Sequence, residues 1–241
     1  MFNKTTILAF HFGGGSKYSF RALEKLLPKA YHWKTVELPG RGDKIGEPLL
    51  DDVHEMVEAI YDEVVEIAQK GEYIMYGHSM GTLIGFELMR KMVASNAPLP
   101  LFLFFTGRGA PAVEREKKLS SLKKDIFWKE IQAIGGLPAE VFEHEDLMDF
   151  FEPILRSDFK ALEDYQYRPL KEPFRIPIYI RVGTEEELTP EKIQAWQDES
   201  VFPLNQRKMK GNHFFIFDDP QGVLDVLIEA HHAVLKMKVM R

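Results

Sequence analysis

A serine lies at the centre of the glycine-flanked run Gly77-His78-Ser79-Met80-Gly81, which has the pattern G-x-S-x-G. The apolar, β-prone run Tyr73 to Tyr76 precedes it, and the helix-like run Thr82 to Arg90 follows it. A serine on a sharp turn between a strand and a helix is held in a strained backbone conformation with its hydroxyl exposed, and flanking glycines avoid a Cβ clash. The pattern therefore predicts that Ser79 is a nucleophile.

A serine hydroxyl becomes a good nucleophile when a histidine takes its proton and a carboxylate orients that histidine. The histidines that follow Ser79 are His144, His213, His231 and His232. His213 lies in a turn-prone segment between the last predicted strand and the last predicted helix, so we expect it to be the base. The other three are expected to be solvated or to have packing roles.

Three consecutive glutamates, Glu185, Glu186 and Glu187, follow the strand predicted over Ile176 to Val182. When the chain order is serine, acid and histidine, the acid belongs after this strand. A glutamate there need only accept a hydrogen bond from the histidine and favour its protonated form. Any of the three could be this acid, and at least two must be ordinary loop charges.

The negative charge that develops on an acyl oxygen needs two backbone N–H groups to stabilise it. One is expected from Met80, the residue after the nucleophile. The other is expected from the loop His11 to Ser16, whose three consecutive glycines let the backbone approach the substrate closely. A phosphate-binding loop is the rival interpretation, but the G-x-x-x-x-G-K-[ST] and G-x-G-x-x-G spacings are both missing.

Short apolar runs alternate with longer amphipathic segments, which predicts an α/β fold with a mostly parallel, doubly wound central sheet flanked by helices. The predicted strands are Thr5 to Phe10, Trp33 to Glu37, Tyr73 to Tyr76, Leu101 to Phe105, Ile176 to Val182 and Asn205 to Met209. The predicted helices include Tyr18 to Leu27, Val53 to Ala68 and Gly222 to Lys236. Right-handed crossovers bring the carboxyl ends of the strands to one edge, where Ser79 would lie.

The stretch from about residue 112 to residue 168 contains no good strand candidate and many aromatic residues. It lies between two predicted strands, so we expect a helical insertion that arches over the carboxyl edge as a lid. A satellite helical bundle with its own core is the plainer interpretation, and the two are compatible. Residues 1–241 are then expected to form a single domain with this insertion.

The chain has 241 residues and a net charge of −6, which removes the global electrostatic case for binding nucleic acid or an anionic membrane. It has no cysteine, so disulfides and zinc-thiolate sites are excluded. The N-terminus lacks the apolar core of a signal peptide, and no apolar run reaches the roughly 18 residues of a membrane span. We therefore expect a cytoplasmic protein without nucleic-acid or membrane partners.

Further motifs follow one another along nearly the whole chain. Phe10 to Gly15 is similar to an F-P-x-A-G-G element, Pro39 to Gly42 matches P-G-R-G, and Thr106 to Pro111 is similar to S-G-R-x-A-P. Within the insertion, Ile134 to Pro138 and Pro153 to Phe159 are similar to lid motifs. In this combination the chain resembles the type II thioesterases that accompany nonribosomal peptide and polyketide synthases, which belong to the α/β-hydrolase superfamily.

The resemblance also implies roles for particular residues. The implied site residues are Ser79 as nucleophile, His213 as base, Glu186 as acid, and Gly13 and Met80 as oxyanion donors. Glu186 stands at the fourth position of a G-x-x-D turn, where the family usually has aspartate, so Glu185 stays open as an alternative. Further departures are His11 for a proline, Gly13 for an alanine, and Asn212 for the aspartate of G-D-H-F. Such a triad needs no metal or cofactor.

The implied activity is hydrolysis of an acyl or aminoacyl thioester on the phosphopantetheine arm of an acyl or peptidyl carrier protein. The alternatives are an acyl-CoA thioesterase or general carboxylesterase, an acyltransferase, and a non-catalytic binding protein. A basic cluster at the start of the insertion is a candidate docking site for an acidic carrier. Its members are Arg115, Lys117, Lys118, Lys123 and Lys124. Interleaved acidic residues favour an ordinary solvated surface instead.

Overall fold

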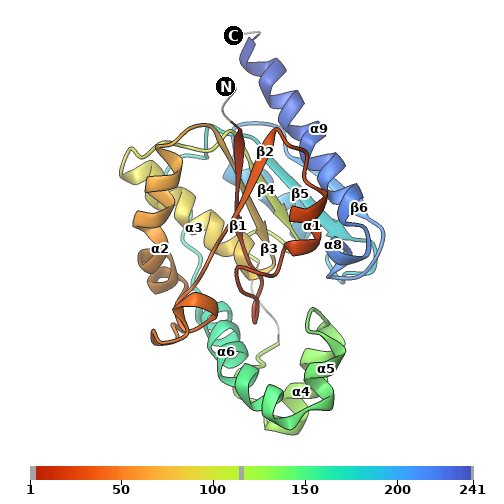
Figure 1. The fold of residues 1–241 in the computed structure, drawn as a ribbon. Helices are drawn as coiled ribbons and strands as arrows, with labels where there is room; N and C mark the ends of the chain where they lie inside the picture. The colour runs from red at the N-terminus through yellow and green to blue at the C-terminus, as the bar shows by residue number, and fades with distance from the viewer. Residues whose placement is uncertain (1–3, 114–116, 240–241) are drawn as a thin grey trace.

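The computed structural model describes residues 4–113 and 117–239, and within these residues six parallel strands form one sheet (Figure 1). The strands lie in the order β2-β1-β3-β4-β5-β6, and each neighbouring pair is parallel. Their bounds are β1 Thr5–Phe10, β2 Tyr31–Val36, β3 Tyr73–His78, β4 Leu103–Thr106, β5 Ile178–Gly183 and β6 Asn205–Met209. All six predicted strands are therefore present, and their ends differ from the predictions by two residues at most.

Helices cover both faces of the sheet. The helices and helical turns outside the insertion are α1 Arg21–Leu26, η1 Gly42–Lys44, α2 Val53–Ala68, α3 Met80–Ala94, α7 Pro190–Gln194, η2 Ala195–Glu199, α8 Phe215–Asp218 and α9 Pro220–Val239. The prediction for α2 was correct at both ends. Asp52 fixes its start, because its side chain accepts from the N–H groups of His54 and Glu55. The predicted first helix began three residues too early.

The strand residues alternate between two hydrophobic cores. Leu8 and Phe10 pack on the side of α2 and α3, whereas Ile7 and Ala9 pack on the side of α1 and α9. Figure 1 shows these two helix pairs on opposite sides of the sheet. Burial on both faces explains why the inner strands are continuous apolar runs and why the sequence reveals them so clearly. The edge strand β6 is mostly exposed and correspondingly polar.

The stretch between β4 and β5 is helical in its described residues, as predicted. It contains α4 Lys124–Ile134, α5 Ala139–Glu143 and α6 Glu145–Asp164. These helices have a core of their own, formed around Phe127, Trp128, Leu155 and Phe159. In Figure 1 they lie beyond the carboxyl end of β1, away from the two chain termini. None of the described helices is long and apolar enough to cross a membrane.

Candidate active site

Ser79 occupies the sharp turn between β3 and α3 that its motif predicts. Its backbone has φ 54° and ψ −111°, a conformation that non-glycine residues seldom adopt. A Cβ at Gly77 would lie 2.5 Å from the carbonyl oxygen of Gly81, and a Cβ at Gly81 would lie 2.0 Å from that of Phe10. Both flanking positions therefore require glycine, and the turn presents the Ser79 side chain at the carboxyl edge of the sheet.

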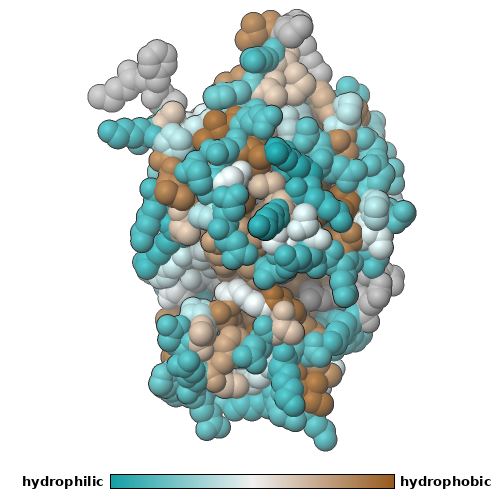
Figure 2. Space-filling view, turned by 90° about the vertical axis from the view of Figure 1, so that its right-hand side faces the viewer, coloured by the Kyte–Doolittle hydropathy of each residue, from teal (hydrophilic) through white to brown (hydrophobic). Residues whose placement is uncertain are grey.

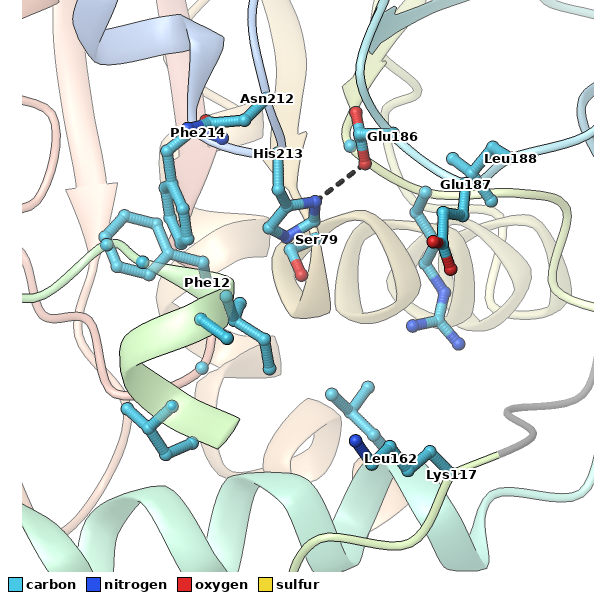
Figure 3. Close-up of a pocket in the computed structure, with 18 of the residues that line it drawn as sticks. Phe12, Ser79, Lys117, Leu162, Glu186, Glu187, Leu188, Asn212, His213 and Phe214 are labelled. Carbon is cyan, nitrogen blue, oxygen red and sulfur yellow. Dashed lines mark hydrogen bonds and ion pairs between the residues drawn. The ribbon is translucent and has the colours of Figure 1, made fainter. Parts of the chain in front are cut away.

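The ring of His213 lies next to Ser79 (Figure 3). Its Nδ1 is 2.7 Å from Oε2 of Glu186, whose other oxygen, Oε1, accepts the backbone N–H of Gly183 at 2.6 Å. The Glu186 carboxylate is only 7% exposed, whereas the His213 side chain is 24% exposed. β5 and β6 pair in parallel up to Gly183 and Met209, so the loops that hold the two side chains begin side by side.

The structure separates the three consecutive glutamates. A turn brings the backbone N–H of Glu186 to 3.4 Å from the carbonyl oxygen of Gly183 and directs the Glu186 side chain back toward His213. Glu185 donates its backbone N–H to the carbonyl of Gly211, and its side chain is exposed. Glu187 is also exposed and lines the edge of the pocket. The carboxylate paired with His213 is therefore the fourth residue of the turn.

The remaining candidate histidines lie elsewhere. His144 and His232 are exposed. His231 is buried on α9, and its Nδ1 is hydrogen-bonded to the hydroxyl of Tyr31 at 2.8 Å. It therefore has the packing role that its place in the terminal helix predicted.

Gly13 and Met80 are the two residues predicted to bind the oxyanion. Gly13 lines the same pocket as Ser79 and His213. Met80 is the first residue of α3, and the first N–H groups of a helix have no acceptor within the helix. The N–H groups that follow Gly13 are engaged: Gly14 donates to Asp158 at 2.7 Å, and Gly15 donates to the carbonyl of Phe12 at 2.9 Å.

A cavity of about 690 Å³ opens over Ser79 and His213. Its wall on the insertion side is mostly apolar and includes Ile131, Leu155 and Phe159. Charged residues, among them Lys117 and Glu187, line it as well. On the face seen in Figure 2, hydrophobic side chains gather in a hollow between the sheet and the insertion, with hydrophilic residues around it. The cavity can therefore hold an apolar chain whose polar end reaches the serine.

A second histidine, His78, packs directly against His213, with 5.0 Å between the ring centroids. It is completely buried, and its Nδ1 is 2.8 Å from Oγ1 of Thr106. Burial, and then the nearby His213, lower the pKa of His78 well below its usual range. His78 therefore stays neutral, and its ring places no positive charge beside His213.

A buried ion pair, Arg41 with Asp158, lies beside this site, and neither residue was among the predicted site residues. Arg41 donates to both carboxylate oxygens of Asp158, at 2.6 and 2.8 Å, and both side chains are almost completely buried. The sequence contains an indication that Asp158 is buried. Asp158 falls at helical spacing from the apolar residues Ile154 and Leu162, so it lies on the buried face of α6 and requires a partner.

His11, which stands where the resembled family has proline, is also buried beside this ion pair. Its Nδ1 is 2.9 Å from the carbonyl oxygen of Phe12, and its Nε2 is 3.8 Å from Oε1 of Glu37. Burial and the positive charge of Arg41 lower the pKa of His11 from 6.5 to about 4, although Asp158 opposes this shift. His11 is therefore neutral in the folded protein at neutral pH.

We expect this histidine to make the fold less stable in acid. Between pH 6.5 and about 4 the unfolded chain protonates His11 and the folded chain does not. Such a shift removes at most about 3 kcal/mol of stability as the pH falls through this window. Urea unfolding of the wild type and of His11→Gln at several pH values measures the effect. The stability advantage of the wild type should shrink toward pH 4.

The comparison with His11→Gln is needed because Glu37 titrates nearby. Burial raises the pKa of Glu37, so its contribution has the opposite sign: it favours the fold in acid and is lost as the pH rises through the raised pKa. Glu37 is present in both proteins, so most of its own contribution cancels in the difference between them. A stability difference that stays constant from pH 7 to pH 4 would contradict the prediction.

Comparisons with known proteins show which family the chain resembles. Residues 5–233 match the family model described as the thioesterase domain. The gramicidin S biosynthesis protein GrsT of Aneurinibacillus migulanus is 28% identical over 98% of this chain and 92% of its own length. Thioesterase PikA5 of Streptomyces venezuelae is 30% identical over 86% of this chain and 74% of its own length. The solved structure of RedJ, a thioesterase of the prodiginine pathway in Streptomyces coelicolor, has a TM-score of 0.85 at 28% identity and covers 95% of this chain and 90% of that one.

Proposed function

The chain belongs to the thioesterase family, and we propose that it is a type II thioesterase that hydrolyses acyl or aminoacyl thioesters from the phosphopantetheine arm of a carrier protein. The proposal rests on one observation above all: the hydrogen-bonded pair of His213 and Glu186 beside Ser79, beneath a cavity with an apolar wall. Relatives named for gramicidin S biosynthesis and for the prodiginine pathway support the choice of substrate class.

In the proposed first half-reaction, Nε2 of His213 takes the proton of Ser79 as the serine oxygen attacks the thioester carbonyl. The backbone N–H groups of Gly13 and Met80 stabilise the resulting oxyanion. When the C–S bond breaks, the imidazolium gives its proton to the departing thiolate, which leaves an acyl-enzyme. Glu186 accepts from Nδ1 of His213 and stabilises its positive charge throughout.

In the second half-reaction, His213 takes a proton from water, and the hydroxide attacks the acyl-enzyme. The same two N–H groups stabilise the second oxyanion. Collapse of this intermediate releases the carboxylic acid and returns the proton to Ser79. No step requires a metal or a cofactor.

We propose that residues 1–241 form a single domain in which the insertion at about residues 112–168 acts as a lid. Its helices α4 and α6 supply the apolar wall of the cavity above the nucleophile. An acyl chain would lie against Ile131, Leu155 and Phe159, where burial removes its apolar surface from water.

A carrier protein is the proposed macromolecular partner, and its acidic surface would meet the basic cluster at the start of the insertion. Arg115 lies outside the described residues. Lys117, Lys118 and Lys123 are exposed, and Lys117 also lines the cavity. Two members have carboxylate partners within the insertion, Lys117 with Glu130 and Lys124 with Asp149. The cluster is therefore less positive than its sequence suggests.

We expect the double charge reversal Lys117→Glu with Lys118→Glu to weaken docking of the carrier. The KM for a carrier-bound acyl group should rise several-fold, while the KM for a small soluble thioester should change little. Steady-state kinetics on both substrates measures this difference. Lys25→Glu with Lys29→Glu is a matched control, because both lysines are exposed and neither lines the cavity. Equal effects on the two substrates would count against docking at this cluster.

The proposed function is tested by giving the wild-type protein one acyl group on three carriers: a phosphopantetheinylated carrier protein, coenzyme A and an oxygen ester. We expect kcat/KM to be highest for the carrier-bound thioester. A preference for coenzyme A or for the ester would indicate an acyl-CoA thioesterase or a carboxylesterase. Transfer of the acyl group to an added alcohol or amine would indicate an acyltransferase. Failure of Ser79 to react with a fluorophosphonate probe would indicate a non-catalytic binding protein.

A further inference from the structure

The buried ion pair of Arg41 and Asp158 joins three parts of the chain that lie far apart in the sequence. Arg41 comes from the turn after β2, Asp158 from α6 of the insertion, and Gly14 from the loop after β1. Oδ2 of Asp158 accepts both from Nη1 of Arg41 at 2.6 Å and from the N–H of Gly14 at 2.7 Å. Nη2 of Arg41 donates to the other oxygen, Oδ1, at 2.8 Å. The Asp158 side chain is fully buried.

The turn that presents Arg41 is constrained on both sides. Gly40 and Gly42 have φ values of +78° and +50°, which favour glycine. A Cβ at Gly42 would lie 1.8 Å from Oε2 of Glu37. The P-G-R-G run therefore forms a tight turn whose arginine is directed inward, and burial of its charge is compensated by the bidentate contact with Asp158.

Helix α6 rests on the glycine loop at two consecutive positions. A Cβ at Gly13 would lie 3.6 Å from Cβ of Asp158, which is ordinary van der Waals contact. At Gly14 a Cβ would lie only 2.5 Å from Cδ2 of Leu155, and φ is +77°. Glycine at position 14 thus lets the insertion approach the loop closely enough for the carboxylate of Asp158 to reach the backbone.

We propose that Asp158 is a positioning residue for the oxyanion site. Held by Arg41, its carboxylate fixes the N–H of Gly14 and thereby the Gly13–Gly14 peptide. This limits rotation about the backbone of Gly13, whose own N–H lies in the preceding peptide, and so keeps that N–H directed at the oxyanion. The inference rests on the proposed function, in which Gly13 binds the oxyanion. It adds that the oxyanion site is complete only while α6 is seated on the loop, so the insertion contributes to the chemical step as well as to the shape of the cavity.

Two double variants separate the hydrogen bond from the charges. Removing one member of a buried ion pair leaves the other unpaired and destabilises the fold, so both charges are removed together. In Arg41→Leu with Asp158→Asn, the amide oxygen can still accept from Gly14. In Arg41→Leu with Asp158→Leu, no acceptor remains. Ser157→Ala is a matched control on the same helix, since its hydroxyl donates to the carbonyl of Leu50 and does not contact the glycine loop.

Two quantities are measured for each variant: the steady-state kinetics of hydrolysis of an acyl thioester, and the rate at which a fluorophosphonate labels Ser79. We expect kcat of the leucine variant to be about 10- to 100-fold lower than that of the asparagine variant, with KM nearly unchanged. A misdirected Gly13 N–H stabilises the oxyanion of the transition state less and leaves binding of the substrate unaffected. Its labelling rate should fall in parallel. Ser157→Ala should keep wild-type kinetics.

Equal kcat and equal labelling rates in the two double variants would overturn the positioning role, as would a change confined to KM. If the leucine variant does not fold, Arg41→Lys replaces it: it keeps the charge pair but loses the bidentate contact. It should slow labelling and lower kcat by a smaller factor, and unchanged labelling would overturn the role. A wild-type protein that labels rapidly but does not hydrolyse acyl thioesters would refute the proposed function alone.

Discussion

Replacement of Ser79 by alanine should lower turnover of a carrier-bound acyl thioester by about a million-fold, to the level supported by binding and oxyanion stabilisation alone. The serine oxygen forms the covalent bond in the proposed mechanism, and no other hydroxyl occupies the turn between β3 and α3. Turnover by the purified variant, together with loss of fluorophosphonate labelling, measures the effect. Activity within ten-fold of the wild type would contradict the proposed nucleophile.

Ser79→Gly provides a matched variant that separates chemistry from stability. Ser79 has a positive φ, which costs a non-glycine residue of the order of 1 kcal/mol or more, and glycine relieves that strain. The glycine variant should therefore be inactive yet unfold at a higher urea concentration than the wild type. Ser79→Ala should be inactive with a free energy of unfolding close to that of the wild type. If the glycine variant were both inactive and unfolded, its loss of activity would be explained by loss of the fold and not by loss of the nucleophile.

The sheet could be predicted from the sequence because its inner strands are buried on both faces. A strand such as β3 has no polar face to interrupt its apolar run, so its type and position are clear from composition alone. The ends of the strands are harder to predict from the sequence. β2 begins at Tyr31, two residues before the prediction, because parallel pairing with β1 extends the strand and this pairing is not encoded locally.

The turn that presents Ser79 was predictable for a different reason. Its glycines are required by steric contacts with Gly81 and Phe10, and only glycine satisfies those contacts, so the requirement appears directly as sequence letters. The contact between Asp158 and Gly14 leaves no such local trace. It spans 144 residues and depends on how α6 packs on the glycine loop after β1. In the sequence, only an acid on the apolar face of a helix indicates it.

The local sequence also could not show which of the three glutamates pairs with His213. Each follows the same strand and each is a carboxylate, so residue type does not distinguish them. The backbone turn from Gly183 makes the distinction, because it directs the fourth residue back toward the sheet and leaves its neighbours exposed. The family resemblance pointed to Glu186 despite the substitution of glutamate for aspartate, and its side chain lies 2.7 Å from Nδ1 of His213.

Glu186→Gln should lower kcat by about 10,000-fold, and Glu185→Gln should leave it nearly unchanged. In the first variant the N–H of Gly183 holds the amide oxygen, as it now holds Oε1 of the carboxylate at 2.6 Å. The amide NH₂ then faces Nδ1 of His213 and favours the tautomer in which Nδ1 is an acceptor and Nε2 carries the proton. Such a ring cannot take the proton of Ser79, and the negative charge that stabilises the imidazolium is gone.

The two variants are matched in chemistry, because each converts one glutamate of the same turn to its isosteric amide. Steady-state turnover of an acyl thioester measures the effect, and the rate of fluorophosphonate labelling of Ser79 should fall in parallel for Glu186→Gln alone. Glu186→Asp keeps the charge at a shorter reach and should lie between the wild type and the amide. If Glu185→Gln instead causes the large loss, then the pairing of Glu186 with His213 is not the one used in catalysis, and the turn must rearrange when substrate binds.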